Sequence, residues 1–468
     1  MTKVMSSLPG SSAHATSRSD RRAVSRRRRA RGFTMAELLV ATLAGLTVSL
    51  GAFAFARAST RTFQQEIRLS DATSNVTIGF RRLVADIERS GYLSTPNIQR
   101  DYYTGNRVCL QPNNSTFPTG IQSLAAIRIE QGSYTGPTGK DSPISTQSTP
   151  SGSVTLSPER LTLSGSYASV EQFAVRAVDT SSGSPIVYLD PLSGAAMRTD
   201  PVRAAGNVPT LKPWANIFLP GRILRLVDRQ GYQHFGVIQS VAISNGAPAI
   251  TLTNIPGLYM RGSVPPTVAN PGCQGIELGV GALANVVNRI RYEVRDLKNV
   301  TDYAALYPTP PVIADDDKRW ELVRYEIDTT GNLIAGTTEL VAPYAIDLRT
   351  ALTVINGGVG PANLLQPNPT LTTVDFGDLN TGTKWAREVP TGSPTTLDGP
   401  ERIRSVRVRL SVRSREPDRT SGLADPDYAG LPDFRPLLRY QIPGTNHYAR
   451  VRTLQAEVSL SNQTSVFY

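Results

Sequence analysis

The stretch RRRRARGFTMAELLV, from Arg26 to Val40, decides how this chain is organised. A run of arginines ends at Gly32, the aromatic Phe33 follows, and a single carboxylate stands at Glu37. From Leu38 to Ala56 the chain then carries no charged residue. This pattern predicts a basic N-terminal segment followed by an apolar helix that spans a membrane.

Glu37 is the costly residue in that span. A carboxylate costs about 2.5–3.5 kcal/mol at the centre of a bilayer, and less towards the edge. The nine larger apolar residues of the span return only roughly 3–5 kcal/mol on the same scale. An anchor with no use for Glu37 would be more stable without it, so we expect the carboxylate to have a functional partner.

Two simpler kinds of N-terminal segment also combine basic residues with an apolar run. A secretory signal peptide is cut after its apolar core, but here Ala56 leads through Arg57 into a charged, helix-like stretch with no A-x-A-like site. An uncleaved signal anchor requires no cut, and it stays open as the alternative.

The Gly-Phe-Thr-x-x-Glu pattern before a long apolar run resembles the cleavage and assembly signal of type IV prepilins. The resemblance implies that a prepilin peptidase cuts between Gly32 and Phe33 and that the new terminal amine of Phe33 is N-methylated. It also implies that Glu37 pairs with the terminal amine of a neighbouring subunit. The function it implies is a subunit of a pilus-like fibre and not an enzyme.

The charge of the chain agrees once the leader, residues 1–32, is considered separately. Nine basic residues and one acidic residue give the leader a net charge of +8, out of +11 for the whole chain. The pI of about 9.7 therefore comes mostly from the leader, and we expect no nucleic-acid partner. Basic residues beside a span stay cytoplasmic, so the N-terminus is expected inside and the remainder outside.

A single long helix is predicted from Phe33 to Ser90, because no proline occurs before Pro96. Residues 33–56 form its transmembrane half and residues 57–91 an amphipathic outer half. Gly91 is expected to end the helix in the left-handed conformation. The apolar residues of the outer half recur at helical spacing on one face, at Val76, Phe80, Leu83, Val84 and Ile87.

Residues 92–468 read as a head rich in β-strands and in Pro, Gly, Ser and Thr. We predict an α+β fold in which an antiparallel sheet packs on the outer helix, with long loops and with one or two cores. The predicted strands are Ala126–Glu130, Arg160–Ser164, Ile186–Leu189, Ile223–Val227, Gly236–Ala242, Ala249–Thr253, Val287–Val294, Trp320–Ile327, Thr338–Leu340, Ile403–Val412 and Arg450–Leu460. Turn-forming residues fill the intervals, including 132–153.

The segment from Phe80 to Tyr92 resembles the helix exit of PilW-like minor pilins, in which Leu-x-x-Asp-Ile-x-x-x-Gly-Tyr recurs. Later stretches resemble the same family in order along the chain, such as residues 221–228, 290–296 and 406–414. The resemblance implies a subunit that resides in the inner membrane and then joins other minor pilins and the major pilin. It further implies that the subunit primes assembly and sits at the pilus tip, with adhesion as a secondary role.

The alternative within this class is a minor pseudopilin of a type II secretion system. One such pseudopilin lacks the charge that matches Glu37, so Glu37 argues against that component only. The rival from another class is a signal-anchored periplasmic enzyme. His234 and His447 have no metal-type spacing, and the chain contains no Gly-x-Ser-x-Gly, His-Glu-x-x-His or phosphate-loop motif. We therefore expect no enzyme, no cofactor and no metal, and we interpret the acidic residues near Asp316 and Asp425 as solvated loops.

Cys109 and Cys273 are the two cysteines of the chain. Both lie in the part expected to be exported, where an oxidising compartment favours one disulfide over two thiols. Such a bridge would close a loop of about 165 residues, worth on the order of 5 kcal/mol in the chain-entropy model.

Overall fold

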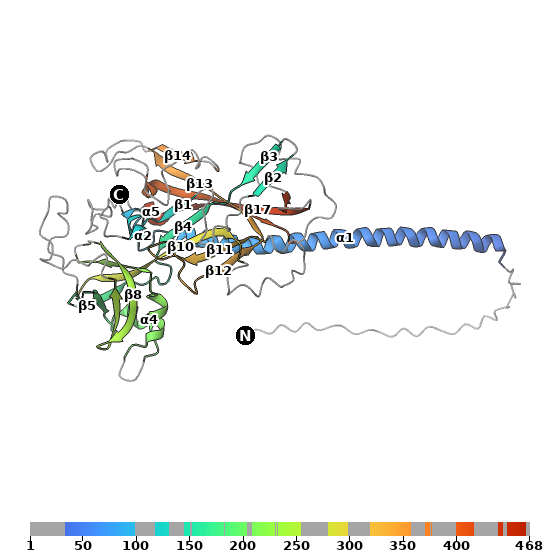
Figure 1. Ribbon diagram of the computed structural model, residues 1–468. Coiled ribbons are helices and arrows are strands. Elements are labelled where there is room, and N and C mark those ends of the chain that lie inside the picture. The colour runs from blue at the N-terminus through green and yellow to red at the C-terminus, as the bar shows by residue number, and fades with distance from the viewer. Residues whose placement is uncertain are drawn as a thin grey trace, which may run out of the picture. The chain divides into compact units, whose positions relative to one another are not determined.

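The computed structural model is shown in Figure 1. The chain divides into two units, Met1–Gln64 and Gln65–Tyr468. The structure describes residues 33–98, 118–130, 145–149, 152–181, 183–203, 208–229, 231, 233–253, 279–297, 319–356, 370–374, 376, 399–415, 439–442 and 447–464.

Helix α1 runs from Met35 to Glu88, 54 residues without a proline. It begins and ends two residues inside the predicted range. Gly91 has a φ of +76°, which confirms the predicted left-handed end. The segment Met35–Gln64 is long and apolar enough to cross a membrane, with a mean hydropathy of 2.1 in its most apolar stretch. Its described apolar side chains are exposed, which is compatible with a single membrane anchor.

The larger of the two main sheets joins ten strands of the described chain, hydrogen-bonded in the order β1-β4-β10-β5-β6-β9-β8-β7, with β11 on β10 and β12 on β11. All described strand pairs in the protein are antiparallel. The strands nearest the helix are β1 (Ile127–Glu130), β4 (Arg160–Gly165), β10 (Leu283–Arg295), β11 (Glu321–Glu326) and β12 (Glu339–Pro343).

The remaining strands of this sheet close into a barrel, because β7 pairs with β10 as well as with β8. Closure leaves these six strands without a free edge between them. At Leu283, β10 pairs with Ala174 of β5 and with Val227 of β7. Besides β10, the barrel strands are β5 (Phe173–Asp179), β6 (Ile186–Leu189), β7 (Ile223–Val227), β8 (Gln233–Ser244) and β9 (Ala247–Leu252).

The second sheet has the order β14-β13-β15-β17-β16. Its strands are β13 (Ala345–Asn356), β14 (Thr370–Val374), β15 (Ile403–Arg413), β16 (Arg439–Gln441) and β17 (Tyr448–Ser459). The strands β2 (Ser145–Thr149) and β3 (Gly152–Leu156) form a separate pair. The short helices are α2 (Thr119–Gln122), α3 (Gly194–Thr199), α4 (Leu211–Ile217), α5 (Ser461–Thr464) and the 3-10 turn η9 (Pro400–Arg402).

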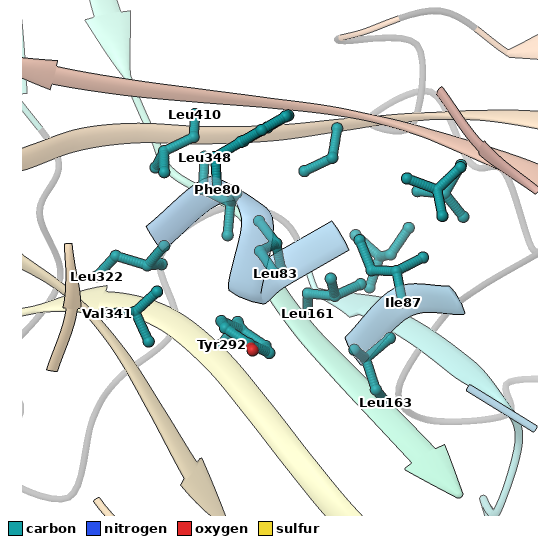
Figure 2. Close-up of a cluster of buried hydrophobic side chains, with 14 of the residues drawn as sticks. Phe80, Leu83, Ile87, Leu161, Leu163, Tyr292, Leu322, Val341, Leu348 and Leu410 are labelled. Carbon is teal, nitrogen blue, oxygen red and sulfur yellow. The ribbon is translucent and has the colours of Figure 1, made fainter. Parts of the chain in front are cut away.

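The main core forms where the last turns of α1 lie between the two sheets (Figure 2). Phe80, Leu83 and Ile87 enter it from the helix, and the first sheet adds Tyr292, among others. The second sheet contributes residues such as Leu410 from the opposite side. The predicted amphipathic face is therefore confirmed: Val76, Leu83 and Ile87 have no exposed surface.

Alternation along the strands explains how both sheets bury this core. In β10, Ile290, Tyr292 and Val294 belong to the core. Successive side chains of a strand point to opposite faces, so the arginines between them lie on the face away from the helix. The same pattern recurs in β15, where Val406, Val408 and Leu410 belong to the core.

A second core fills the barrel, so the head has two large apolar centres. Phe173, Trp214 and Phe218 contact one another in it, with ring centroids 5.3–6.2 Å apart. Trp214 comes from α4, and small side chains of α3 pack against the same cluster. The sequence predicted one or two hydrophobic cores. The structure shows two large ones, because the barrel contains a core that is separate from the one around α1.

Most of the predicted strands are confirmed, and Ile186–Leu189 and Ile223–Val227 match to the residue. The predicted turn region 132–153 was wrong in part, because β2 and the start of β3 lie within it. Strands β5, β13, β14 and β16 were missed. The sequence of β2 is STQST, which contains no large apolar residue that would indicate a strand.

We predict that Gly79→Ala destabilises the head. A Cβ at Gly79 would lie 2.5 Å from the carbonyl oxygen of Val341, because α1 presses against β12. Overpacking of this kind costs about 1–3 kcal/mol, which exceeds the gain of about 1 kcal/mol that alanine brings to a helix interior. Chemical unfolding of the full chain in detergent measures the loss.

Gly45→Ala is the matched control, since Gly45 lies in the same helix and a Cβ there meets nothing within 4 Å. Its unfolding free energy should equal that of the wild type or exceed it slightly. Equal stability of the two variants would contradict the close packing of α1 on β12.

Candidate assembly site

The start of α1 is built around reciprocal hydrogen bonds between Thr34 and Glu37. The backbone N–H of Thr34 donates to Oε2 of Glu37 over 3.0 Å, and the N–H of Glu37 donates to Oγ1 of Thr34 over 3.3 Å. The Thr34 hydroxyl also donates to the same carboxylate oxygen over 3.1 Å. This arrangement is a capping box, which satisfies two backbone donors that the first turn of a helix leaves unpaired.

The sequence reasoning missed this box, although Thr-x-x-Glu before an apolar run is its signature. Its consequence is that Glu37 has a local partner in its own chain. The cost of placing this carboxylate in a membrane therefore does not by itself require a partner from a neighbouring subunit.

The box also survives the predicted cut, because it uses atoms of Thr34 and Glu37 only. A terminal amine on Phe33 would place a positive charge just before the positive end of the helix dipole. The carboxylate of Glu37 in the first turn offsets that charge. Phe33 itself is 81% exposed, and Gly32 lies outside the described residues.

The helix beyond Glu37 presents large apolar side chains that nothing in the described chain covers. Leu38 to Phe55 include side chains that are 59–77% exposed, such as Leu50 and Phe55. A soluble protein rarely exposes a continuous apolar surface of this length, so the segment is suited to lipid or to the apolar helices of other chains.

At the other end of α1, the helix is tied to the sheet by the buried carboxylate of Asp86. The Tyr292 hydroxyl donates to its Oδ2 over 2.7 Å, and Nε of Arg324 donates to the same oxygen over 2.7 Å. The hydroxyl of Tyr167 donates to the backbone carbonyl of Asp86 over 2.7 Å. Strands β10 and β11 and the loop after β4 therefore bind a single residue of the helix.

Burial and charge in this cluster perturb the pKa values of its members. Burial raises the pKa of Tyr292 and of Tyr167 well above the usual range, and the nearby charge of Asp86 raises both further. Burial is the largest single effect on Arg324 and lowers its pKa, but the charge of Asp86, its hydrogen bond and the nearby Tyr292 and Glu339 together outweigh burial and raise the pKa. Both tyrosines therefore remain neutral donors, and Arg324 remains a cation, at every physiological pH.

The turn after the helix is fixed in the same way. The N–H of Gly91 donates to the carbonyl of Ser164 over 2.8 Å. The side-chain amide of Asn462 donates to the carbonyls of Glu88 and Ser90, each over 3.1 Å. A residue near the C-terminal end of the described chain thus caps the end of α1. The Asp-Ile-x-x-x-Gly pattern noted in the sequence marks the point where the helix ends within the head.

The other residues singled out in the sequence are two histidines, two cysteines and two acidic stretches. His234 is buried in β8, and burial lowers its pKa to about 4, so it is neutral at pH 7. His447 is exposed just before β17. Cys109, Cys273 and the acidic residues near Asp316 and Asp425 lie outside the described residues, so the disulfide stays a prediction.

Comparison of this chain with protein-family models, with curated proteins and with solved structures finds no match.

We predict that Asp86→Asn destabilises the head by about 3 kcal/mol, because removing one partner of a buried ion pair leaves the other charge uncompensated. Asp86 is 2% exposed, so water cannot replace the lost carboxylate. Arg198→Gln is the control, because it removes an ion pair with Glu171 that lies away from this cluster and in which the Arg198 side chain is 65% exposed. That change should cost much less, because water screens an exposed ion pair. Denaturant unfolding of the full chain measures both, and equal losses would contradict the anchoring role of Asp86.

Proposed function

We propose that this chain is a membrane-anchored subunit of a pilus-like fibre, a minor type IV pilin. The observation that carries the proposal is the start of α1: one carboxylate at Glu37, followed by an exposed apolar stretch with no charge up to Ala56. Together with Gly32 and Phe33, this arrangement resembles the prepilin signal. The chain leaves the inner membrane with its head outside and joins other minor pilins and the major pilin.

The packing of the end of α1 between the two sheets of the head supports a role in a fibre. Subunits held by their apolar helices must transmit force from the helix to the head. In this protein α1 continues from the apolar segment into the core, where Asp86, Phe80 and Leu83 fasten it to both sheets. A bulky head with two cores suits a tip or priming position, where it is not repeated along a thin shaft.

The proposal predicts a specific cut. Mass spectrometry of the N-terminal peptide from membranes should find a peptide that begins at N-methylated Phe33, and only in cells that contain prepilin peptidase. A leader that remains intact with and without the peptidase would overturn the proposal and leave a signal-anchored protein. A peptide cut after Ala56 would indicate an ordinary secretory signal.

A second prediction separates the two uses of Glu37. Glutamine also completes a capping box, so Glu37→Gln keeps the helix start but removes the charge that would pair with a neighbour's amine. Thr34→Ala keeps the charge and removes the cap, at about 1 kcal/mol. We expect Glu37→Gln to reduce the amount of this chain in sheared fibres at least tenfold, and Thr34→Ala to reduce it little.

Thr34→Ser is the matched control, because serine restores the capping hydroxyl. Immunodetection in purified fibres and in membranes measures incorporation and expression separately. Normal incorporation of Glu37→Gln with loss in Thr34→Ala would show that Glu37 serves only to cap the helix.

A further inference from the structure

Buried carboxylates lie at two of the places where the sheets around the end of α1 are joined. The first is Glu159, the residue just before β4, which has no exposed surface. Its backbone N–H donates to the carbonyl of Leu348 in β13 over 2.8 Å. Its Oε2 accepts from the N–H of Thr350 over 2.6 Å and also from the Thr350 hydroxyl. The residue that leads into β4 is therefore bound three times by one strand of the second sheet.

This first joint lies at the margin of the main core, which Figure 2 shows with Leu348 labelled. Leu348 and Leu352 belong to that core, and Thr350 stands between them on the same face of β13. The carboxylate that Thr350 binds is therefore on the side of β13 that faces α1. A change of charge on Glu159 acts directly on the packing around the helix.

The second joint is at Tyr344, the single residue between β12 and β13. Its φ of +57° is rare for a bulky residue. The guanidinium groups of Arg319 and Arg413 each lie 4.9 Å from the centre of its ring. The N–H of Arg413, the last residue of β15, donates to the carbonyl of Tyr344 over 2.9 Å. The chain crosses from the first sheet to the second at this residue, and β15 is tied to the crossing.

Glu321 is the carboxylate at this second joint. It is the first residue of β11 and pairs with Pro343, next to Tyr344. Glu321 has no exposed surface, and its Oε1 is paired with the guanidinium of Arg319. Its Oε2 has no hydrogen-bond partner within the part of the chain that the structure describes. A buried carboxyl that is incompletely paired is costly as an anion and much less costly as a neutral acid.

Burial is the largest effect on the pKa of Glu159 and raises it to about 7. The hydrogen bonds from Thr350 and the charge of Arg349 lower this pKa, whereas the charge of Asp347 raises it. From the neighbouring strand β15, Arg409 lies 3.6 Å from Asp347. Together these groups do not outweigh burial, so the neutral acid is favoured in the folded head.

Burial likewise raises the pKa of Glu321 to about 7, against the charges of Arg319 and Arg413 and together with that of Asp296. A carboxyl whose pKa is higher in the folded chain than in the unfolded one binds its proton more tightly when folded. The stability that each carboxyl contributes is therefore complete below about pH 4.5, the pKa of an exposed glutamate, and is lost as the pH rises through about 7.

We propose that Glu159 and Glu321 make the two sheets a pH-sensitive clamp on α1, which is tight while both carboxyls are protonated and loosens when they ionise. The proposal rests on position: both carboxyls are fully buried, and each lies at a joint between the sheets. Loosening occurs on the alkaline side of neutrality, because ionisation there places an anion in each joint. The clamp concerns the grip of the head on its own helix, so it stands independently of fibre assembly.

Hydrogen exchange of the full chain in detergent micelles, resolved by residue, tests the clamp. The reporters are the amides of Thr350 at the first joint, Arg413 at the second, and Leu83 and Ile87 in the helix. After correction for the intrinsic exchange rate, opening should be at least about tenfold more frequent at about pH 8.5 than at about pH 5.5. Equal opening at the two pH values would overturn the proposal.

Three substitutions assign the effect to the two joints. Glu159→Gln keeps an acceptor for Thr350 and carries no charge at any pH, so opening at Thr350 should lose its pH dependence while Arg413 keeps it. Glu321→Gln should do the reverse. Glu88→Gln removes an equal charge from an exposed position on α1 and should change neither reporter. A pH dependence that persists when both buried glutamates are replaced would contradict the clamp.

His234 in the barrel acts in the opposite direction, because burial lowers its pKa to about 4 and its protonation in acid is unfavourable. It is unchanged in every variant, so differences between the variants exclude its contribution. Infrared difference spectra of the wild type cover the case in which a glutamine variant does not fold. A protonated carboxylic acid should form between about pH 8.5 and about pH 5.5, and its absence would rule the clamp out.

Discussion

The buried carboxylate of Asp86 is the contact on which the arrangement of the head depends. It lies on α1, but it is bound by Tyr292 of β10 and Arg324 of β11. A buried charge is stable only when its partners are in place, so the rotation of the helix about its axis is determined at this residue. With that rotation set, Phe80, Leu83 and Ile87 point into the space between the two sheets.

Strand β10 then connects the two cores. Its first residues, Leu283 to Val287, pair within the barrel, and its later residues pair with β4 and β11 beside the helix. Asn288 lies where β10 passes from its barrel partners to its partners beside the helix, and its side-chain amide donates to the carboxylate of Glu326 over 2.9 Å. Glu326 in turn binds the guanidinium of Arg222 over 2.7 and 2.8 Å. This buried polar group holds the barrel to the helix-bearing part of the sheet, since leaving any member unpaired would be costly.

The two faces of the sheet beside α1 differ in chemical character. The face towards α1 is apolar and stabilises the fold. On the other face, Arg160 of β4 and Arg289, Arg291 and Arg295 of β10 line one cavity of about 410 Å³.

Much of this protein was determined by the sequence alone. The long helix, its apolar and amphipathic halves and its end at Gly91 follow from the spacing of apolar residues, the absence of proline and a single left-handed residue, all of which are local properties. Most strands of the head could be predicted for the same reason, because the alternation of apolar and polar residues along a strand is a local pattern. Strands such as β2 and β5 were not, because their residues alternate weakly and pairing partners decide their conformation.

The residues of the candidate site likewise fall into those that the sequence could predict and those that only the tertiary structure shows. Residues Gly32, Phe33 and Glu37 could be found in the sequence, and the Thr34–Glu37 box could have been, because it spans one turn. Only the tertiary structure decided that Asp86 anchors the helix, that six strands close into a barrel and that four arginines line one pocket. The physical reason is distance along the chain: the side chains that bind Asp86 are 206 and 238 residues away. No local pattern specifies which remote hydroxyl or guanidinium group a buried carboxylate meets, and only the packed fold brings them together.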